Sequence, residues 1–240
     1  MAGSLIWISG ASSGLGQALA AAIPWEGSRL ISISRRAPDG MEHLEADLSD
    51  PSSWPRVGAS FREEIKETDA DRVIFVHAAG TVEPMGFAGE VDDGAYLANV
   101  VLNSAAPQVL GHLFLKAAQS IEASRHLIMI TSGAAHSTYA GWSSYGAGKA
   151  AIDQWVRNVG AEQALRGGVQ VMAVAPGTVD TGMQAHLRDT DEADFPKRQK
   201  FLDLHQAGKL SDPHEVAAKI WGLLDQDLDN GSVIDLRDLE

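Results

Sequence analysis

The chain has 240 residues, of which 45% are hydrophobic and 21% are charged. These values are ordinary for a globular protein and allow a single domain with a full core. The formal net charge of −13 argues against binding to nucleic acid and to anionic membrane surfaces. The sequence contains no cysteine, which excludes disulfides and thiolate metal sites, and we predict no metal site.

The N-terminal sequence, Met1-Ala2-Gly3-Ser4, leads directly into a short apolar run. It lacks the basic region and the long hydrophobic stretch of a signal peptide. No apolar run approaches the ~18 to 20 residues that are needed to span a bilayer. We therefore expect a cytoplasmic protein without a membrane or nucleic-acid partner.

Short apolar runs alternate with longer amphipathic segments along the whole chain. Several runs are β-branched with little polar alternation, which is typical of parallel strands that are covered on both faces. This order predicts one doubly wound α/β domain over residues 1–240, a Rossmann fold with a seven-stranded parallel sheet. The expected strands are Leu5–Ser9, Arg29–Ser34, His43–Ala46, Val73–Ala78, His126–Thr131, Val169–Ala175 and Ser232–Leu236.

Amphipathic segments between these runs predict the helices. Pro24 ends the first helix, and Pro213 takes the first position of the last one. The segment 182–210 is long for a connection between a strand and a helix, and we expect it to cover the substrate. A plain surface insertion is the alternative. The expected helices are Gly14–Ile23, Ser52–Lys66, Asp92–Ser120, Ser143–Leu165 and Pro213–Asp225.

A glycine-rich turn follows the first strand and opens the first helix. Between Gly10 and Gly16, missing side chains allow a tight turn and a close approach of the backbone to a pyrophosphate. The helix N-terminus adds free N–H groups and a partial positive charge. We therefore predict dinucleotide binding, and a turn that serves packing alone is the alternative. The expected contacts are Gly10, Ser12, Ser13, Gly14, Leu15 and Gly16.

The second strand ends in Ser34-Arg35-Arg36. An acidic residue at this place would bind the ribose 2′-hydroxyl of NAD, whereas arginine accommodates the 2′-phosphate of NADP. We predict NADPH, with Arg35 as the main contact and Arg36 beside it, because guanidinium donors match phosphate geometry. A solvated strand exit is the alternative. Asp47, followed by Leu48, is expected either to bind the adenine amino group or to cap the next segment.

Tyr145 and Lys149 stand four residues apart on one predicted helix, so their side chains share a face. A free tyrosine has a pKa near ~10, and a neighbouring ammonium is expected to lower that pKa. Ser132 ends the fifth predicted strand, where binding crevices of open α/β sheets form. Its hydroxyl can hold a carbonyl oxygen while Tyr145 protonates it, which predicts a reductase. Taken singly, a buried tyrosine, a solvated lysine and a capping serine are the alternatives.

These motifs resemble the short-chain dehydrogenase/reductase family over essentially the whole chain. The resemblance rests on Ser9-Gly10-x3-Gly14-x-Gly16, Ser132, Tyr145-x3-Lys149 and Pro176–Thr181. It implies that an asparagine joins the catalytic set and holds a water in a relay to Lys149; Asn103 fits best and Asn99 is the competitor. It also implies that Lys149 binds the nicotinamide ribose. The further cofactor contacts that it implies are Ala79, Gly80, Tyr145, Pro176, Gly177, Val179 and Thr181.

One place departs from the family pattern. The usual Asn-Asn-Ala-Gly after the fourth strand reads His77-Ala78-Ala79-Gly80 here. Gly80 keeps the close backbone approach to the cofactor, but both asparagine side chains are lost. We interpret His77 as a structural replacement for one of them and not as a catalyst.

Shorter strings are similar to the bacterial benzil reductases that form (S)-benzoin, which are similar to sepiapterin reductase. The similarity implies NADPH-dependent reduction of one carbonyl of a vicinal diketone, with a sepiapterin-like or other ketone as the alternative. No basic residue is expected to anchor an anionic substrate. The strings are Ser34–Arg36, Ala79–Val82, Ser132–Ala135, Gly141–Trp142, Asp180–Ala185 and Gly208–Leu210. The expected pocket residues are Ala134, Trp142 and Met183, with Met85, Leu187 and Phe201 as further candidates and core packing as the alternative for Trp142.

Two other classes of protein share part of this pattern. A regulatory protein could sense NADPH through the same fold, but it would not need to keep an acid such as Tyr145. A sugar-nucleotide epimerase shares the Tyr-x3-Lys pair but usually carries a larger C-terminal substrate region. The family resemblance further implies a homodimer or homotetramer that pairs through the helices at 92–120 and 143–166.

Overall fold

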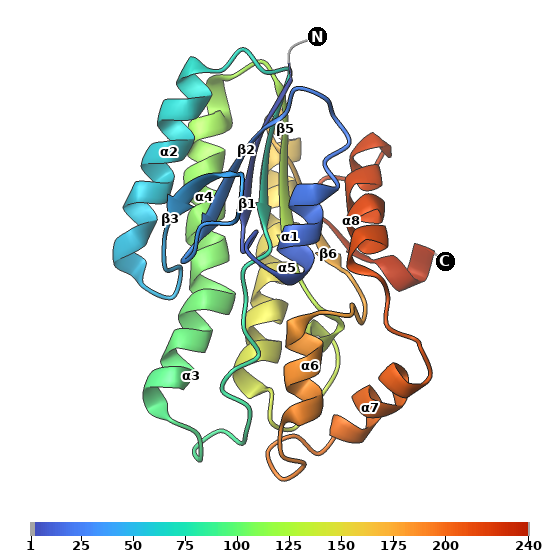
Figure 1. Ribbon diagram of the computed structural model, residues 1–240. Coiled ribbons are helices and arrows are strands. Elements are labelled where there is room, and N and C mark those ends of the chain that lie inside the picture. The colour runs from blue at the N-terminus through green and yellow to red at the C-terminus, as the bar shows by residue number, and fades with distance from the viewer. Residues whose placement is uncertain (1–2, 240) are drawn as a thin grey trace.

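A computed structural model describes residues 3–239 of the chain. Seven strands form one parallel sheet in the order β3-β2-β1-β4-β5-β6-β7, which confirms the predicted doubly wound fold (Figure 1). The strands are β1 (Ser4–Ser9), β2 (Arg29–Ser34), β3 (Glu42–Glu45), β4 (Arg72–His77), β5 (Ser124–Ile130), β6 (Gln170–Ala175) and β7 (Ser232–Asp235). From β1 the chain builds the sheet outward through β2 and β3. It then returns to the other side of β1 and adds β4, β5, β6 and β7 in order.

Both faces of the sheet are buried. Along β1, Leu5 and Trp7 enter one apolar cluster, whereas Ile6 and Ile8 enter the cluster on the opposite face. This two-sided burial explains why the strands form nearly continuous apolar runs in the sequence. The first face is covered by α2 (Trp54–Glu67), α4 (Ala106–Ala117) and α5 (Ser143–Ala164), and the second by α1 (Gly14–Ala21) and α8 (Pro213–Gly222) (Figure 1).

The helix that was expected over 92–120 is interrupted. α3 (Asp93–Val100) leads into a π-helical turn at Val101–Ala105, and α4 follows. Pro107 has no N–H to donate to the carbonyl of Asn103, four residues earlier, so a regular α-helix cannot continue through this point. The segment nevertheless stays helical from Asp93 to Ser120, as expected, and the π-helical turn is the feature that the sequence did not predict. The π-helical turn places Asn103 next to the carboxyl end of the sheet.

The segment 182–210 contains two short helices, α6 (Gly182–Asp189) and α7 (Arg198–Gln206). Figure 1 shows both beyond the carboxyl ends of the strands. α8 follows with Pro213 at its first position, as expected, and the Asp212 carboxylate caps it by accepting hydrogen bonds from the backbone N–H groups of His214 and Glu215. Within residues 3–239, every helix is too short or too polar to cross a lipid bilayer.

Candidate active site

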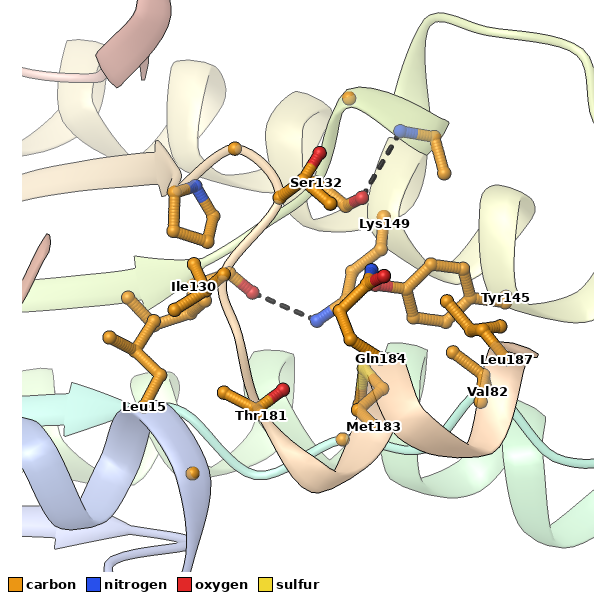
Figure 2. A pocket seen from close by; sticks show the side chains of 18 of the residues that line it. Leu15, Val82, Ile130, Ser132, Tyr145, Lys149, Thr181, Met183, Gln184 and Leu187 are labelled. Atoms are coloured by element: carbon orange, nitrogen blue, oxygen red, sulfur yellow. Dashed lines mark hydrogen bonds between the residues drawn. The ribbon is translucent and has the colours of Figure 1, made fainter. Parts of the chain in front are cut away.

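A cavity of about 440 Å³ lies at the carboxyl ends of the strands, where the loops after β1, β4, β5 and β6 meet α6 and α7 (Figure 2). A doubly wound sheet opens a crevice at this place because the chain turns in opposite directions after β1 and β4. Most of the predicted site residues line this cavity: Gly10, Ser13, Gly14, Leu15, Gly16, Ala79, Gly80, Ser132, Ala134, Trp142, Tyr145, Lys149, Pro176, Gly177, Val179, Thr181 and Met183.

The glycine-rich turn lets α1 approach the end of β1 closely. Gly10 and Gly14 have φ angles of 73° and 54°, in the left-handed region that favours glycine. A Cβ atom at Gly16 would lie only 2.2 Å from the carbonyl oxygen of Gly10. Ser13, the residue before α1, makes no capping hydrogen bond with its side chain, so N–H groups at the start of the helix are free to bind an anion. These residues fit the pyrophosphate of a dinucleotide.

His77 has a structural role between β1 and β4. The Ser9 hydroxyl accepts hydrogen bonds from the N–H groups of Ala78 and Ala79, each at 3.1 Å, and lies 3.1 Å from Nδ1 of His77. Because both N–H groups donate to it, the hydroxyl keeps its own proton to donate to Nδ1. Burial, with a contribution from the charge of Lys149, lowers the pKa of His77 to about 3. The ring thus replaces a lost asparagine as a tie between the two central strands.

Ser132, Tyr145 and Lys149 come together in the cavity (Figure 2). The Lys149 Nζ atom donates a hydrogen bond to the carbonyl oxygen of Ile130 at 2.8 Å and lies 5.7 Å from the centre of the Tyr145 ring. The Ser132 hydroxyl lies close enough to the Tyr145 phenol to act on its pKa, which it lowers. It also accepts a hydrogen bond from the N–H of Ala134 at 3.2 Å, so it caps the following turn as well. Strand β5 and the first turns of α5 hold the set in place.

The pKa of Tyr145 is shifted in the direction opposite to the one expected. Burial raises the pKa of Tyr145, and the Ser132 hydroxyl opposes this effect only in part. Burial also lowers the pKa of Lys149 to about 8, against the charge of Asp153. The lowering was expected from the Lys149 ammonium together with the positive ring of the oxidised cofactor, whereas in the protein by itself the loss of water around a phenolate is the larger effect. A raised pKa keeps Tyr145 protonated, as a proton donor must be.

Asn103 lies behind Gly80 and does not line the cavity itself. A Cβ atom at Gly80 would lie 2.9 Å from Oδ1 of Asn103 and 3.5 Å from Nζ of Lys149, so the three residues converge. The Asn103 amide accepts a hydrogen bond from the N–H of Thr81 at 3.1 Å and donates to its carbonyl oxygen at 2.7 Å. Asn99 lies one turn earlier and accepts a hydrogen bond from Asn103 at 3.0 Å. Asn103 is therefore the asparagine placed beside Lys149.

Other predicted cofactor residues lie outside the cavity. Arg35 and Arg36 are exposed at the end of β2, and among residues 3–239 neither guanidinium has a carboxylate partner. Asp47 accepts hydrogen bonds from the N–H and the hydroxyl of Ser49, at 3.0 and 2.6 Å, so it caps the local turn. Leu48 is buried in the core. Ser12 is half-buried in the glycine-rich turn and does not line the cavity either.

The wall on the substrate side is aromatic. Trp142 stacks on Phe195 with ring centres 4.6 Å apart, and its ring centre lies 5.1 Å from that of Tyr145. Its indole N–H donates to the sulfur of Met85 at 2.8 Å. Trp142 therefore both lines the cavity and packs in a core. Met85 lies behind Trp142 and not in the cavity, whereas the other candidates, Leu187 and Phe201, do line it.

Sequence reasoning missed several polar residues of the cavity, and two of them, Lys200 and Arg237, are basic, whereas the expected pocket residues included no basic residue. Lys200 donates a hydrogen bond to the Tyr139 hydroxyl at 2.9 Å, and Arg237 pairs with Asp235. No local signal identifies Arg237, because the fold brings it to the cavity from the end of β7. Gln184 was detectable in principle, since it stands next to Met183 on the same predicted segment. The missed polar residues include Ser137, Tyr139, Gln184, Lys200 and Arg237.

The fold and the site together define an oxidoreductase that acts on CH–OH or C=O groups with a nicotinamide cofactor. The sequence profile of the short chain dehydrogenases matches residues 4–192. The chain belongs to this family, as its motifs indicated.

Similar proteins agree with this assignment. A benzil reductase ((S)-benzoin forming) from Bacillus cereus is 32% identical over 240 residues, which is 95% of this chain and 96% of the relative. Sepiapterin reductase from Mus musculus is 30% identical over 258 residues, covering 96% of this chain and 95% of the relative. The crystal structure of a 3-oxoacyl-[acyl-carrier protein] reductase from Brucella melitensis in complex with NAD has the same fold, with a TM-score of 0.79 at 18% identity over 98% of this chain and 96% of that chain.

Proposed function

We propose that the protein is an NADPH-dependent carbonyl reductase that reduces one carbonyl of a vicinal diketone, such as benzil to (S)-benzoin. The observation that carries this proposal is the convergence of Ser132, Tyr145 and Lys149 in a cavity with an aromatic wall. Such a wall accepts a flat apolar substrate. The similarity to the benzil reductase of Bacillus cereus supports the diketone as the substrate class.

When bound, the nicotinamide cofactor supplies the hydride that reaches the carbonyl carbon. The Ser132 hydroxyl holds the carbonyl oxygen, and Tyr145 transfers its phenolic proton to that oxygen. The Lys149 ammonium stabilises the resulting phenolate and also binds the nicotinamide ribose. Asn103 supports the water relay that returns a proton to Lys149. A positioned proton donor of this kind contributes roughly 10²- to 10⁴-fold to the rate.

Arg35 and Arg36 support the choice of NADPH. Both guanidinium groups are exposed beside the edge of the cofactor crevice and have no carboxylate partner within residues 3–239. A 2′-phosphate would receive paired N–H donors there. We expect Arg35→Ser to lower kcat/KM for NADPH roughly 10-fold or more while it changes that for NADH little. Arg62→Ser, on the exposed side of α2, is the matched control. A wild-type protein that uses NADH as well as NADPH would contradict this choice.

The segment 182–210 is part of the proposal as the cover of the substrate. Met183, Leu187 and Phe201 reach the cavity from α6 and α7. Their apolar side chains would exclude water from the carbonyl while the proton is transferred.

The decisive experiment is a panel of carbonyl compounds that is assayed by the oxidation of NADPH. Benzil and other vicinal diketones should be reduced most efficiently, ahead of quinones, pterins and simple ketones. Chiral chromatography of the product should show (S)-benzoin. Tight NADPH binding without oxidation by any carbonyl would instead identify a sensor protein. Preferred reduction of a pterin would move the substrate class to that of the sepiapterin reductases.

A further inference from the structure

Gln184 is a polar residue at the first turn of α6 that the mechanism above does not use. Its side chain extends into the cavity on the side where Tyr145 and Lys149 enter it (Figure 2). The residue is half-buried, and its Oε1 atom is fully buried. Among residues 3–239, no donor reaches this atom. A buried amide group without a partner is uncommon in a folded protein and calls for an explanation.

The surroundings of Gln184 are apolar and hold it in place. Val82, Met183 and Leu187 line the same part of the cavity, and Leu187 is only 1% exposed. His186 on the same helix pairs with Glu83 in the loop after β4, which ties α6 to the rim of the cavity. The amide nitrogen of Gln184 also forms no hydrogen bond among residues 3–239 and, unlike Oε1, is not a buried unpaired atom, so it is the group that can donate to a ligand in the cavity.

We propose that Gln184 binds a second oxygen of the substrate, on the carbon next to the reacting carbonyl. It thereby selects α-dicarbonyl compounds and α-hydroxy ketones over simple ketones. This inference rests on the proposed reductase function and assigns a further specificity-determining residue to it. A primary amide suits this task because its N–H group donates to a carbonyl oxygen and its oxygen accepts from a hydroxyl.

Several other polar groups of the cavity already have a role or a partner. The hydroxyls of Ser132 and Tyr145 are committed to the reacting oxygen. Lys200 is bonded to the Tyr139 hydroxyl, and Arg237 is paired with Asp235. Gln184, in contrast, is neutral and has an unused amide. A neutral donor also matches an uncharged diketone, which would not compensate a buried charge.

The reaction leaves this contact unchanged. A hydride adds to the carbonyl carbon that is held by Ser132, and the Tyr145 proton adds to its oxygen, which converts that carbonyl into an alcohol. The neighbouring carbonyl keeps its oxygen and continues to accept the hydrogen bond from Gln184. The product is an α-hydroxy ketone. Gln184 therefore binds substrate and product alike, and its loss should raise KM more than it lowers kcat.

The test compares two ketones that differ only in the second oxygen. Benzil carries it, whereas 1,2-diphenylethanone has a methylene group in its place. Gln184→Met keeps the length and helix propensity of the side chain but removes the amide. We expect the ratio of kcat/KM for benzil to kcat/KM for 1,2-diphenylethanone to fall roughly 10-fold or more in this variant, mainly through KM.

Gln199→Met on α7 is the matched control, because Gln199 is exposed in the same segment and does not line the cavity. It should keep the wild-type ratio. An equal loss with both ketones in Gln184→Met would overturn the inference and assign Gln184 to packing, or to a contact with Arg188 one turn later. An unchanged ratio would overturn it as well. If the wild-type protein reduces neither ketone, the proposed function itself fails, and the inference falls with it.

Discussion

Tyr145 is 7% exposed, and its phenol lies where water cannot solvate a negative charge. Burial raises the pKa of Tyr145, so the side chain holds its proton until a stronger base forms on the substrate. The alkoxide that forms during carbonyl reduction is such a base. The residue therefore acts as an acid because its surroundings disfavour the phenolate in the resting protein.

Tyr145→Phe removes the proton and keeps the ring that packs against Trp142. We expect kcat for reduction to fall by roughly 10²- to 10⁴-fold, because the phenol is the proposed proton donor and phenylalanine has no proton to transfer. The dissociation constant for NADPH, measured by fluorescence titration, should change little. Tyr96→Phe also loses a hydroxyl that is bonded to a serine, Ser143, and serves as the control. Substantial activity in Tyr145→Phe would contradict the assigned role.

Lys149 determines how the reaction depends on pH. Burial lowers the pKa of Lys149 to about 8, and the charge of Asp153 raises it. The ammonium that stabilises the phenolate is present below this pKa and is lost as the pH rises through it. We therefore expect kcat/KM to fall above about pH 8, since this parameter reports ionisations of the free enzyme. Asp153→Asn should move this fall to lower pH, as measured by pH–rate profiles.

Glu162→Gln gives the control for that shift, because it removes the same charge from an exposed position on α5. Its profile should match the wild-type profile. A profile of Asp153→Asn that also matches the wild type would show that Asp153 does not act on Lys149.

Two local departures from regular secondary structure, a π-helical turn and a glycine-rich turn, shape the site. The π-helical turn before α4 arises because Pro107 cannot donate to the carbonyl of Asn103, and it brings Asn103 beside Gly80 and Lys149. The glycine-rich turn brings α1 into contact with the end of β1. In both cases a residue that breaks regular secondary structure shapes the cofactor crevice.

Gly16→Ala tests the contact between α1 and β1. The added methyl group would lie 2.2 Å from the carbonyl oxygen of Gly10, a backbone atom that cannot move without displacing the turn. We expect a loss of about 1–3 kcal/mol in the free energy of unfolding, from overpacking, and a much weaker affinity for NADPH. Gly222→Ala at the end of α8 meets no atom within 4 Å and should leave both quantities nearly unchanged. Urea unfolding measures the free energy of unfolding of the two variants, and titration with NADPH measures their affinity for the cofactor.

Acid stability is a property of the whole molecule, because folding removes water from two histidines, the buried His77 and the half-buried His126, and so favours their neutral forms. Burial lowers the pKa of His77 to about 3 and that of His126 to about 4. Between these values and the ordinary value near ~6.5, the unfolded chain binds more protons than the folded chain. The stability is therefore fully present above about pH 6.5 and declines as the pH falls.

His77→Asn restores the residue that the family usually has at this place and removes one of the two titrating groups. Between pH 7 and pH 5, the free energy of unfolding should decline by about 2 kcal/mol less in this variant than in the wild type. Urea unfolding at several pH values measures the difference. His112→Asn, at an exposed position of α4, should decline as the wild type does. A decline in His77→Asn equal to that of the wild type would show that His77 does not couple folding to pH.

The sheet, its strands and most of the cavity were predictable because their signals are local. Buried parallel strands require apolar runs, a tight βα turn requires glycine, and two residues four positions apart on a helix share a face. On these grounds it could be predicted that Ser132, Tyr145 and Lys149 lie close together. Arg237 could not be predicted, because the fold brings it to the cavity from the end of β7 and no local pattern marks it. Gln184 stands beside the predicted Met183, but only the packing of α6 turns its side chain into the cavity.

The amino-acid sequence by itself determined the architecture and the family and predicted the residues of the proposed proton transfer, since each depends on spacing along the chain. The tertiary structure decided the direction of the pKa shifts of Tyr145 and Lys149, the role of His77 and the identity of the asparagine beside Lys149. These properties depend on how much water surrounds a group and on which distant atoms contact it. Such quantities are set only when the sheet and its helices are packed together.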